Sequence, residues 1–412
     1  MKEYVSKRSR SQTSPNDIIR IAGMAKADKD SGNEVINASI GAFLDEEKKL
    51  GTIRIINETL KEHITDNLAY PSSLGNREYQ EAVMDFVFAE KRKTIEENNQ
   101  VFFGATLGGT GAISICFNLF VEENRRVILP NVMWTNYTLI ASKAHIGYRT
   151  YTLLTEDGHF NIQSLKETIE EEIADCGRAL VVINDPCQNP TGYCLEKAEY
   201  DSLFQMLNEE SRKGYLSVIF DIAYFSFYPP SKGEFPLFGK LCENNTFLPL
   251  VVFSCSKVFS MYGLRCGALI ALCPDETNRK EIHEAFLAQA RGVYSVPVGS
   301  VLYAVSFALN DPSKKDELAE EIKETSSLLE KRSSVMISLL DQVQIRHYPY
   351  VGGFFITLIT KNAFSLFERL KKKHIYTVPM DDNHLRLALS GLSIPDVNAL
   401  VQELKKEIIE ND

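Results

Sequence analysis

The stretch Leu248-Pro249-Leu250-Val251-Val252-Phe253-Ser254-Cys255-Ser256-Lys257 decides the fold of this chain. Its first six residues are a continuous apolar run, which is typical of a strand buried in a parallel sheet. A lysine just after such a strand is unusual, because removing an ammonium group from water is costly. The same loss of water lowers the pKa of a lysine, and its neutral amine can then form a Schiff base with a carbonyl. The stretch therefore predicts an α/β fold with a reactive Lys257 at the carboxyl end of a strand, where open α/β sheets bind ligands.

Two more apolar runs end in polar residues in the same way. Residues 216–220 are followed by Asp221, with Tyr224 three positions later. Residues 180–183 lead into a polar turn that contains Asn189-Pro190-Thr191-Gly192. Taken singly, this turn is an ordinary turn signal and Asp221 could cap a helix. Taken together, three strands that end in polar groups predict a ligand site at one end of a sheet.

In this order, and with Arg265 eight positions after Lys257, these residues resemble the fold type I pyridoxal-phosphate (PLP) enzymes. Within that group they are similar to the class I aminotransferases, which include the aspartate and aromatic amino acid aminotransferases. The resemblance runs from about Asn37 to Arg386. It implies an α/β structure of the PLP-dependent transferase fold type I, in which a large domain with a mainly parallel sheet covered by helices is joined to a smaller α+β domain.

The resemblance also implies a cofactor and a reaction. Pyridoxal 5′-phosphate would form a Schiff base with Lys257, and an amino group would move from an L-amino acid of aspartate or aromatic type to a 2-oxo acid such as 2-oxoglutarate. Asp221 corresponds to the aspartate that keeps the pyridine nitrogen protonated, so that the ring accepts electrons. Asn189 and Tyr224 correspond to two hydrogen-bond donors to the phenolate oxygen of the cofactor. Lys257, Asp221 and Tyr224 are therefore the expected catalytic residues.

A glycine-rich turn, Leu107-Gly108-Gly109-Thr110-Gly111-Ala112, precedes an apolar stretch that predicts a helix. The free amides and the dipole at a helix start suit a phosphate dianion, and glycine lets the backbone approach closely. The turn lacks the Gly-Lys-Ser/Thr of a nucleotide-binding loop and the spacing of a dinucleotide site. A plain tight turn is the alternative. The resemblance implies the cofactor phosphate at Gly108, Gly109 and Thr110 of this turn and at Arg265. Ser254 and Ser256 are further expected cofactor-binding residues.

Two aromatic residues are expected near the cofactor. Trp134 is the only tryptophan of the chain, and it lies where the family has an aromatic ring stacked on the pyridine ring. A lone tryptophan also serves as core or interface packing. Tyr70 resembles the tyrosine that reaches the cofactor phosphate of the neighbouring subunit, which implies a homodimer with shared active sites. A tyrosine in a turn before a proline is the alternative.

Arginines predict how substrate is bound, because a guanidinium holds a carboxylate through two parallel hydrogen bonds. Arg386 lies where the family binds the α-carboxylate, and the alternating residues 385–389 predict a strand at the edge of the small-domain sheet. Arg291 resembles an arginine that crosses the dimer to a side-chain carboxylate, and Gly41 matches a mobile segment that closes over substrate. A solvated strand arginine, a helix-end arginine and an ordinary turn are the respective alternatives. The expected substrate-binding set is Gly41, Trp134, Asn189, Arg291 and Arg386.

Two departures from the family pattern limit the assignment to the aspartate branch. After Arg291 the chain has Val296-Pro297-Val298 where the family usually has Asn-Pro-Pro. Three residues beyond Trp134 that branch often has a histidine, and this chain has Tyr137. A PLP-dependent carbon–sulfur β-lyase would share every cofactor residue and is the alternative enzyme. A non-enzymatic regulator that senses the cofactor is a further alternative, although such proteins usually carry a basic DNA-binding domain.

The composition agrees with an enzyme of this kind, which is expected to be cytoplasmic. The 412 residues carry a net charge of −10 with a pI near 5.4, which argues against a nucleic-acid surface. No apolar run reaches membrane-spanning length, and residues 1–17 lack the apolar core of a secretory signal. The eight cysteines are expected to be free thiols, and the seven histidines form no metal-ligand pair.

The order of elements predicts two domains. Short apolar runs alternate with helical stretches over residues 48–314, which are expected to form the large PLP-binding domain. Asp311-Pro312-Ser313 interrupts the chain before a long helix expected from about Asp316 to Gln342. The remaining expected parts are the small domain, residues 17–47 and 315–412, and a flexible N-terminus, residues 1–16.

Overall fold

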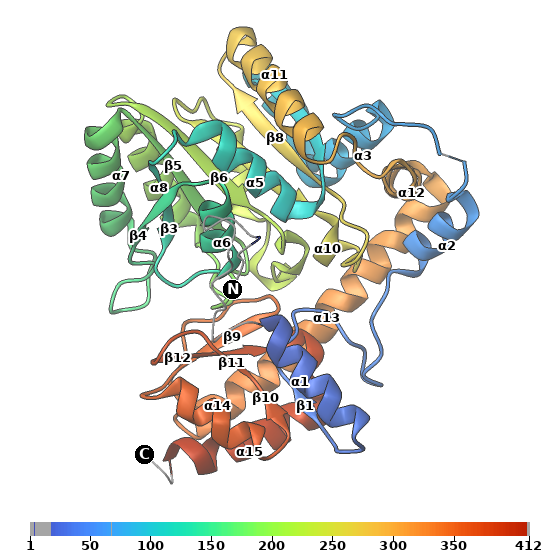
Figure 1. The fold of residues 1–412 in the computed structure, drawn as a ribbon, viewed down its shortest axis with the longest axis vertical. Helices are drawn as coiled ribbons and strands as arrows, with labels where there is room; N and C mark the ends of the chain where they lie inside the picture. The colour runs from blue at the N-terminus through green and yellow to red at the C-terminus, as the bar shows by residue number, and fades with distance from the viewer. Residues whose placement is uncertain (1–3, 5–17, 67, 410–412) are drawn as a thin grey trace.

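A computed structural model of the chain describes Tyr4, residues 18–66 and residues 68–409. The flexible N-terminus expected over residues 1–16 lies outside this part, apart from Tyr4. Figure 1 shows an upper body built on a large sheet and a lower body in which the early and late parts of the described chain lie together. The long helix α13 (Pro312–Gln342) passes between the two bodies.

The upper body contains a seven-stranded sheet in the order β2-β8-β7-β6-β5-β3-β4. Its strands are β2 (Gln100–Thr106), β3 (Arg126–Pro130), β4 (Gly147–Tyr151), β5 (Arg178–Asn184), β6 (Tyr215–Asp221), β7 (Leu248–Ser254) and β8 (Gly267–Cys273). Neighbouring strands from β4 to β7 are parallel, and β8 lies antiparallel to both β2 and β7. The predicted fold class, an α/β fold with a mainly parallel sheet, is confirmed.

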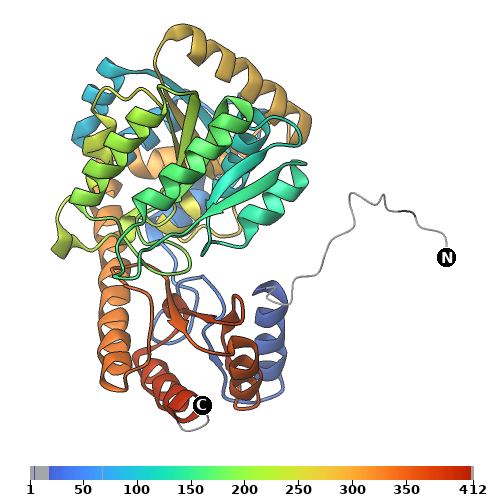
Figure 2. The ribbon, with the colours of Figure 1, turned by 90° about the vertical axis from the view of Figure 1, so that its left-hand side faces the viewer.

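Helices cover both faces of this sheet because its central strands are apolar on both sides. In β5, Val181 and Ile183 belong to the core beneath α7 and α8, whereas Leu180 and Val182 belong to the core beneath α5, α6 and α11. Figure 2 shows helices on either side of the sheet. The helices of the upper body are α2 (Arg54–His63), α3 (Arg77–Phe88), α4 (Arg92–Asn98), α5 (Gly108–Phe120), α6 (Asn136–Lys143), α7 (Ile162–Cys176), α8 (Lys197–Glu210), α9 (Pro236–Leu241), α10 (Cys255–Val258), α11 (Glu276–Val293) and α12 (Gly299–Asn310), with short 3-10 turns at Ala89–Lys91, Phe225–Phe227 and Pro230–Lys232.

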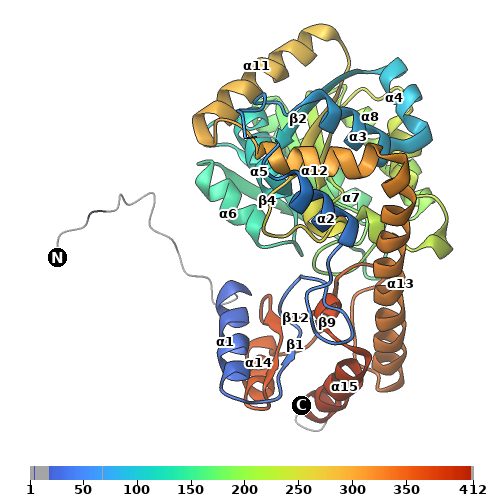
Figure 3. The ribbon, with the colours of Figure 1, turned by 90° about the vertical axis from the view of Figure 1, so that its right-hand side faces the viewer.

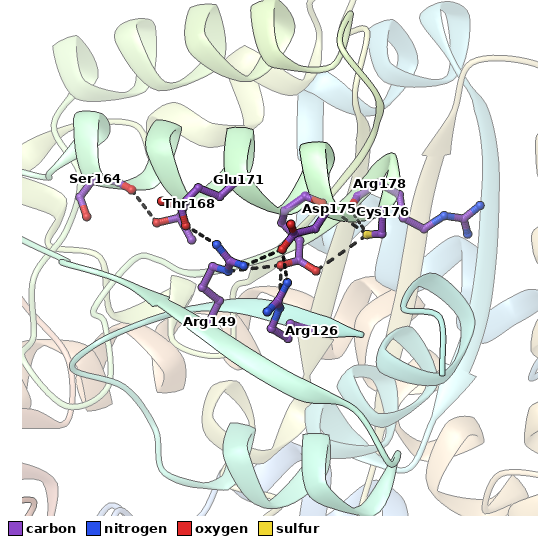
Figure 4. A network of polar contacts seen from close by, with 9 residues as sticks. Arg126, Arg149, Ser164, Thr168, Glu171, Asp175, Cys176 and Arg178 are labelled. Carbon is purple, nitrogen blue, oxygen red and sulfur yellow. Dashed lines mark hydrogen bonds and ion pairs between the residues drawn. The ribbon is translucent and has the colours of Figure 1, made fainter. Parts of the chain in front are cut away.

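A charged network joins β3 and the edge strand β4 to α7 (Figure 4). The buried Glu172 of α7 accepts a hydrogen bond from Arg126 Nε at 3.0 Å, and Arg149 Nε lies 3.3 Å from the same carboxylate oxygen. Both arginines also contact Asp175, and Arg149 contacts Glu171. Every charge in this network has a partner of opposite sign, so the network holds the helix on the sheet.

The lower body combines the early and the late parts of the chain. β1 (Ile36–Asn37) pairs in parallel with β10 (Ile375–Tyr376), and a three-stranded antiparallel sheet has the order β11-β12-β9. The remaining elements are β9 (Phe355–Ile359), β11 (Val378–Pro379), β12 (His384–Ala388), α1 (Ile18–Asp30), α14 (Ala363–Lys371), α15 (Ile394–Ile409) and a 3-10 turn at Leu389–Gly391. Figure 3 shows α1 beside α14, with α15 nearby.

The helix α13 contributes to both hydrophobic cores. Leu318 packs in the core of the upper body, whereas Leu329, Met336 and Leu340 pack in that of the lower body. These two cores support the predicted division into domains, which stays a prediction. The predicted boundary at residue 314 lies inside the first turn of α13.

Two predictions about local structure were wrong, one in the lower body and one at the start of α13. The strand that carries Arg386 was expected at the edge of its sheet, but β12 lies in the centre, between β11 and β9. The alternation around Arg386 reflects two buried faces, one of which borders the cavity described below. The long helix begins at Pro312 and not near Asp316, because the Asp311 side chain caps the Ser313 amide at 2.8 Å and proline is tolerated in a first helical turn.

Two further properties concern the chain as a whole. None of the described helices is long and apolar enough to cross a membrane. All eight cysteines are free thiols, as predicted.

Candidate active site

A cavity of about 290 Å³ opens where β5, β6 and β7 end. The last residues of these strands, Asn184, Asp221 and Ser254, lie in its wall. This is the end of the sheet at which the sequence predicts a ligand site. Besides Asp221 and Ser254, the predicted residues in the wall are Gly41, Gly109, Thr110, Trp134, Asn189, Tyr224, Ser256, Lys257, Arg265 and Arg386.

Lys257 lies in the short helix α10, three residues after the end of β7. Its amine donates a hydrogen bond to the carbonyl oxygen of Gly41 and lies 4.9 Å from the centre of the Tyr262 ring. Burial, and then the positive charges of Arg386 and Arg265, lower the pKa of Lys257 to about 7. A large fraction of the amine is therefore neutral near pH 7 and able to attack a carbonyl carbon.

Asp221 provides the carboxylate of the cavity. Its Oδ2 accepts a hydrogen bond from the Tyr137 hydroxyl at 2.6 Å, and its Oδ1 accepts one from the Ala223 amide at 3.2 Å. Burial nevertheless raises the pKa of Asp221 to about 6. Among the described residues no lysine, arginine or histidine forms an ion pair with it. A buried carboxylate in this condition suits a ligand that brings a positive charge, such as a pyridinium nitrogen.

Asn189 and Tyr224 lie next to each other, with the Asn189 side-chain nitrogen 3.5 Å from the Tyr224 hydroxyl. Asn184 holds this arrangement, because its Oδ1 accepts from the Asn189 amide at 2.8 Å and its Nδ2 donates to the Asp221 carbonyl oxygen at 2.9 Å. The buried Oδ1 of Asn189 has no hydrogen-bond partner. This Oδ1 can only accept a hydrogen bond, so the donors that the predicted contact with a phenolate oxygen requires are Asn189 Nδ2 and the Tyr224 hydroxyl.

The start of α5 forms a cradle for an anion. Arg265 Nη1 donates to Ser256 Oγ at 2.9 Å, and the first amides of α5 have no partners within the helix. Gly108 has a φ of +70°, and a β-carbon at this position would collide with the Arg265 guanidinium. Glycine is therefore required here for the close approach of the cation to the helix start. A guanidinium, hydroxyls and free amides in one place suit a phosphate.

Arg386 lies in β12 and is only 2% exposed. Its Nη2 donates to the Ser39 carbonyl oxygen at 2.8 Å, and its guanidinium carbon lies 4.4 Å from the centre of the Phe355 ring. Its Nε is buried without a partner, and no carboxylate of the described residues pairs with it. Burial lowers the pKa of Arg386 to about 10, so it stays charged at neutral pH. This position suits the carboxylate of a ligand.

Several residues of the cavity wall have no role assigned from the sequence. Tyr137 was noted only as a departure from the family pattern, and its position three residues after Trp134 was the single signal. The edge of its ring contacts Trp134, with the ring centres 5.3 Å apart. The other unassigned residues of the wall are Ile18, Ile113, Asn184, Ala223, Tyr262 and Phe355.

Three predicted site residues are not in the wall of this cavity. Gly108 lies behind it, against Arg265. Tyr70 is 90% exposed, and Arg291 is exposed in the last turn of α11. Their proposed contacts with a neighbouring subunit therefore stay predictions.

Together these side chains match pyridoxal phosphate group by group. Lys257 is available for the carbonyl, Asp221 for the ring nitrogen, and the start of α5 with Arg265 for the phosphate. The orphaned Oδ1 of Asn189 and the required Gly108 are independent signs of a ligand in this cavity. The fold and the site thus define a pyridoxal-phosphate-dependent transferase.

Comparison with known proteins gives the family. The profile of aminotransferase class I and II matches residues 33–404, and the chain belongs to this family. The chain is similar to the aromatic-amino-acid aminotransferase of Escherichia coli, with 25% identity over 80% of this chain and 82% of that protein. It is also similar to the mitochondrial aspartate aminotransferase of Saccharomyces cerevisiae, with 22% identity over 98% and 95%.

Solved structures agree with this assignment. The fold is similar to an aminotransferase from Anaerococcus prevotii, with a TM-score of 0.90, 27% identity and coverage of 98% and 99% of the two chains. An aromatic-amino-acid aminotransferase from Burkholderia pseudomallei, covalently bound to pyridoxal phosphate, shares the fold with a TM-score of 0.81, 19% identity and coverage of 98% and 100%. The protein is an enzyme that transfers amino groups between amino acids and 2-oxo acids with pyridoxal phosphate. These relatives do not favour the β-lyase.

Proposed function

We propose that this aminotransferase is a cytoplasmic homodimer that moves the amino group of an L-amino acid of aspartate or aromatic type to a 2-oxo acid such as 2-oxoglutarate. The observation that carries the proposal is the buried, anion-free Arg386 in the same cavity as Lys257. A guanidinium with a free Nε can hold the α-carboxylate that all amino acid and 2-oxo acid substrates share. Lys257 then lies in the same enclosed space as the α-carbon of the substrate.

Pyridoxal phosphate, when bound, supplies a carbonyl that condenses with amines and a ring that accepts electrons from the substrate's α-carbon. Lys257 and the cradle around Arg265 would hold it, and Asp221 would hold a proton at its ring nitrogen. The Lys257 amine, with its pKa near 7, can take a proton from the α-carbon and give one back. Tyr262, Phe355 and Trp134 supply apolar wall that limits the access of water to this proton.

The choice of donor side chain depends on the charges near it. The cationic side chains in the cavity wall are Lys257, Arg265 and Arg386, and each has a proposed partner already. An aromatic side chain needs no further charge and suits the apolar part of the wall. The side-chain carboxylate of aspartate needs another cation, and the proposed source is Arg291 of a second subunit.

Exposed apolar side chains support a second subunit near these residues. Leu68 and Tyr70 are 79% and 90% exposed, and Val293, two residues after Arg291, is 70% exposed. A contact with a second subunit would remove these apolar side chains from water. Shared active sites would give both Tyr70 and Arg291 a ligand to contact.

The role of Lys257 is tested by chemical labelling. Borohydride reduction of the cofactor-loaded enzyme, followed by peptide mapping, should attach the cofactor to Lys257. Lys257→Ala should lose both the label and turnover, whereas Lys240→Ala, which removes an ion-paired lysine outside the cavity, should keep both. Labelling at another lysine in the wild type would overturn the assignment. The donor class is then read from the absorbance change of the cofactor with a panel of amino acids.

Shared sites are tested by mixing inactive subunits. Lys257→Ala and Arg291→Ala homodimers should both be poor with aspartate, but a hybrid dimer has one site with an intact Lys257 and an intact Arg291 from its partner. Mixing the two variants should therefore restore turnover with aspartate. No recovery in hybrids confirmed by native mass spectrometry would contradict the shared site.

A further inference from the structure

The contact between Tyr137 and Asp221 joins two elements that are far apart in sequence. Tyr137 lies in the first turn of α6, and its hydroxyl reaches the carboxylate at the end of β6. The distance of 2.6 Å is that of a hydrogen bond to an ionised acceptor. Both residues line the cavity, and both are almost fully buried.

The environment of Tyr137 fixes its hydroxyl as the donor. Burial and the charge of Asp221 raise the pKa of Tyr137 well above its usual range, so that it keeps its proton. The edge of its ring packs against Trp134, and its backbone amide donates to the Trp134 carbonyl oxygen at 3.0 Å. Unlike an imidazole, which titrates near pH 6.5, a phenol with a raised pKa donates at any pH at which the enzyme works.

The two oxygens of Asp221 each have one donor from the protein. Oδ2 accepts from Tyr137 and Oδ1 from the Ala223 amide, and both hydrogen bonds favour the ionised carboxylate. A carboxylate oxygen can accept more than one hydrogen bond, so capacity remains for the ring nitrogen of the cofactor. When the cofactor is bound, a single proton would be shared between that nitrogen and Asp221, and the relative proton affinity of the two groups would decide where it stays.

We propose that Tyr137 is a positioning residue that holds Asp221 as a carboxylate, so that the shared proton stays on the ring nitrogen of the cofactor. The proposal rests on the proposed role of Asp221 as partner of that nitrogen. Without the hydroxyl, Asp221 would hold a proton more tightly, and the ring would lose positive charge. A hydrogen bond to a charged group shifts such an equilibrium by about tenfold or more.

The chain offers a matched control in a second tyrosine–aspartate pair. The Tyr200 hydroxyl donates to Asp185 Oδ2, also at 2.6 Å, and Asp185 Oδ1 accepts from the Leu195 amide at 2.9 Å. Both side chains are buried, and neither lines the cavity. Removal of the Tyr200 hydroxyl therefore makes the same chemical change in the protein, away from the cofactor.

The experiment measures where the proton lies by nitrogen NMR of the holoenzyme, loaded with cofactor labelled at the ring nitrogen. Tyr137→Phe should move the resonance from its wild-type position toward that of an unprotonated ring. Asp221→Asn should move it in the same direction, and Tyr200→Phe should leave it in place. Tyr137→Met, which also lacks a donor, serves as a second variant if Tyr137→Phe does not fold.

A second measurement is cofactor binding, read from the fluorescence of Trp134, the only tryptophan and part of the cavity wall. Tyr137→Phe should raise the dissociation constant of pyridoxal phosphate when Asp221 is present. It should not raise it in the Asp221→Asn variant, because that variant has no carboxylate for Tyr137 to keep ionised.

A wild-type resonance in Tyr137→Phe, with a shifted one in Asp221→Asn, would overturn this inference alone. A wild-type resonance in Asp221→Asn would overturn the role of Asp221, and this inference would fall with it.

Discussion

Two arginines are buried in the lower body under opposite conditions. Arg332 of α13 is 0% exposed, and its Nε and Nη2 donate to the Glu46 carboxylate at 2.9 and 2.6 Å, while its Nη1 donates to the Ser390 carbonyl oxygen at 3.2 Å. Arg386 is 2% exposed, yet it has a single carbonyl partner and no carboxylate among the described residues. Both guanidinium groups lie over a phenylalanine ring.

The difference separates a structural charge from a binding charge. A buried cation with an internal anion stabilises the fold in the conformation that brings the two together. A buried cation without one costs free energy, and that cost is recovered when a ligand supplies the anion. The same contrast distinguishes the fully paired network of β4 and α7 (Figure 4) from the cavity as a whole.

The comparison is first tested by removing the structural arginine. Arg332→Ala should lower the free energy of unfolding by about 3 kcal/mol, because it leaves a cavity and takes away the partner of Glu46. Urea unfolding measures this loss, and kcat/KM per folded subunit should change little. A stable Arg332→Ala with impaired kinetics would show that the two arginines do not differ as described.

The opposite result is expected for the binding arginine. Arg386→Ala should lower kcat/KM by about a hundredfold for every amino donor, since two hydrogen bonds to the substrate carboxylate are lost. Its free energy of unfolding should not fall as that of Arg332→Ala does, because no internal ion pair is broken. Steady-state kinetics and urea unfolding of the same preparation check both parts, and Arg386→Lys should lie between wild type and alanine.

Arg291 differs from both buried arginines because its side chain is exposed at the end of α11. Arg291→Ala should lower kcat/KM for aspartate or glutamate by about a hundredfold and spare uncharged amino acids. Equal losses for both classes, or none, would leave Arg291 as a helix-end arginine. Because Val296 and Val298 depart from the family pattern nearby, aromatic or other neutral donors paired with 2-oxoglutarate are the alternative outcome.

The smallest effect concerns a buried carboxyl group, Asp185. Burial raises the pKa of Asp185 to about 7, whereas an unfolded aspartate has a pKa near 3.9. The folded state therefore keeps a proton that the unfolded state releases, and this contribution to stability is lost as the pH rises toward 7 and beyond. From pH 5 to pH 7 the loss is about 2 kcal/mol.

Asp185→Asn, which cannot titrate, should not show this loss. Urea unfolding of both proteins at the two pH values isolates the contribution of Asp185 as a difference. Parallel pH profiles for the two proteins would mean that Asp185 is already ionised in the folded state.

The sequence predicted those parts of the site whose chemistry lies next to a strand end. Asp221 follows an apolar run directly, and Lys257 and Asn189 lie in the turns after two others, so parallel strands bring them to one edge of the sheet. Tyr137 could not be assigned in this way, because its contact with Asp221 spans 84 positions and depends on how α6 packs. The same holds for Ser39, which contacts Arg386 only after the early part of the chain joins the lower body, and for Phe355, which contacts Arg386 through the pairing of β9 with β12.

The order of the strands in the lower sheet could not be predicted from the pattern of apolar residues either. The alternation around Arg386 is the same for a central strand as for an edge strand, so the sequence supported the wrong position. The start of α13 at Pro312 was also misplaced. Asp311-Pro312-Ser313 is typical both of a break in the chain and of a capped helix start, and the pattern does not distinguish the two.

The pairing of β1 with β10 has a consequence for the order in which the protein acquires its structure during synthesis. All strands of the large sheet lie between residues 100 and 273, so their partners leave the ribosome early. Ile36 is among the first of the described residues to emerge, but its partner Ile375 is among the last. The segment that carries Gly41 to Lys257 therefore cannot be fixed by this pairing until Ile375 has been synthesised, and the cofactor cannot meet a complete cavity before then.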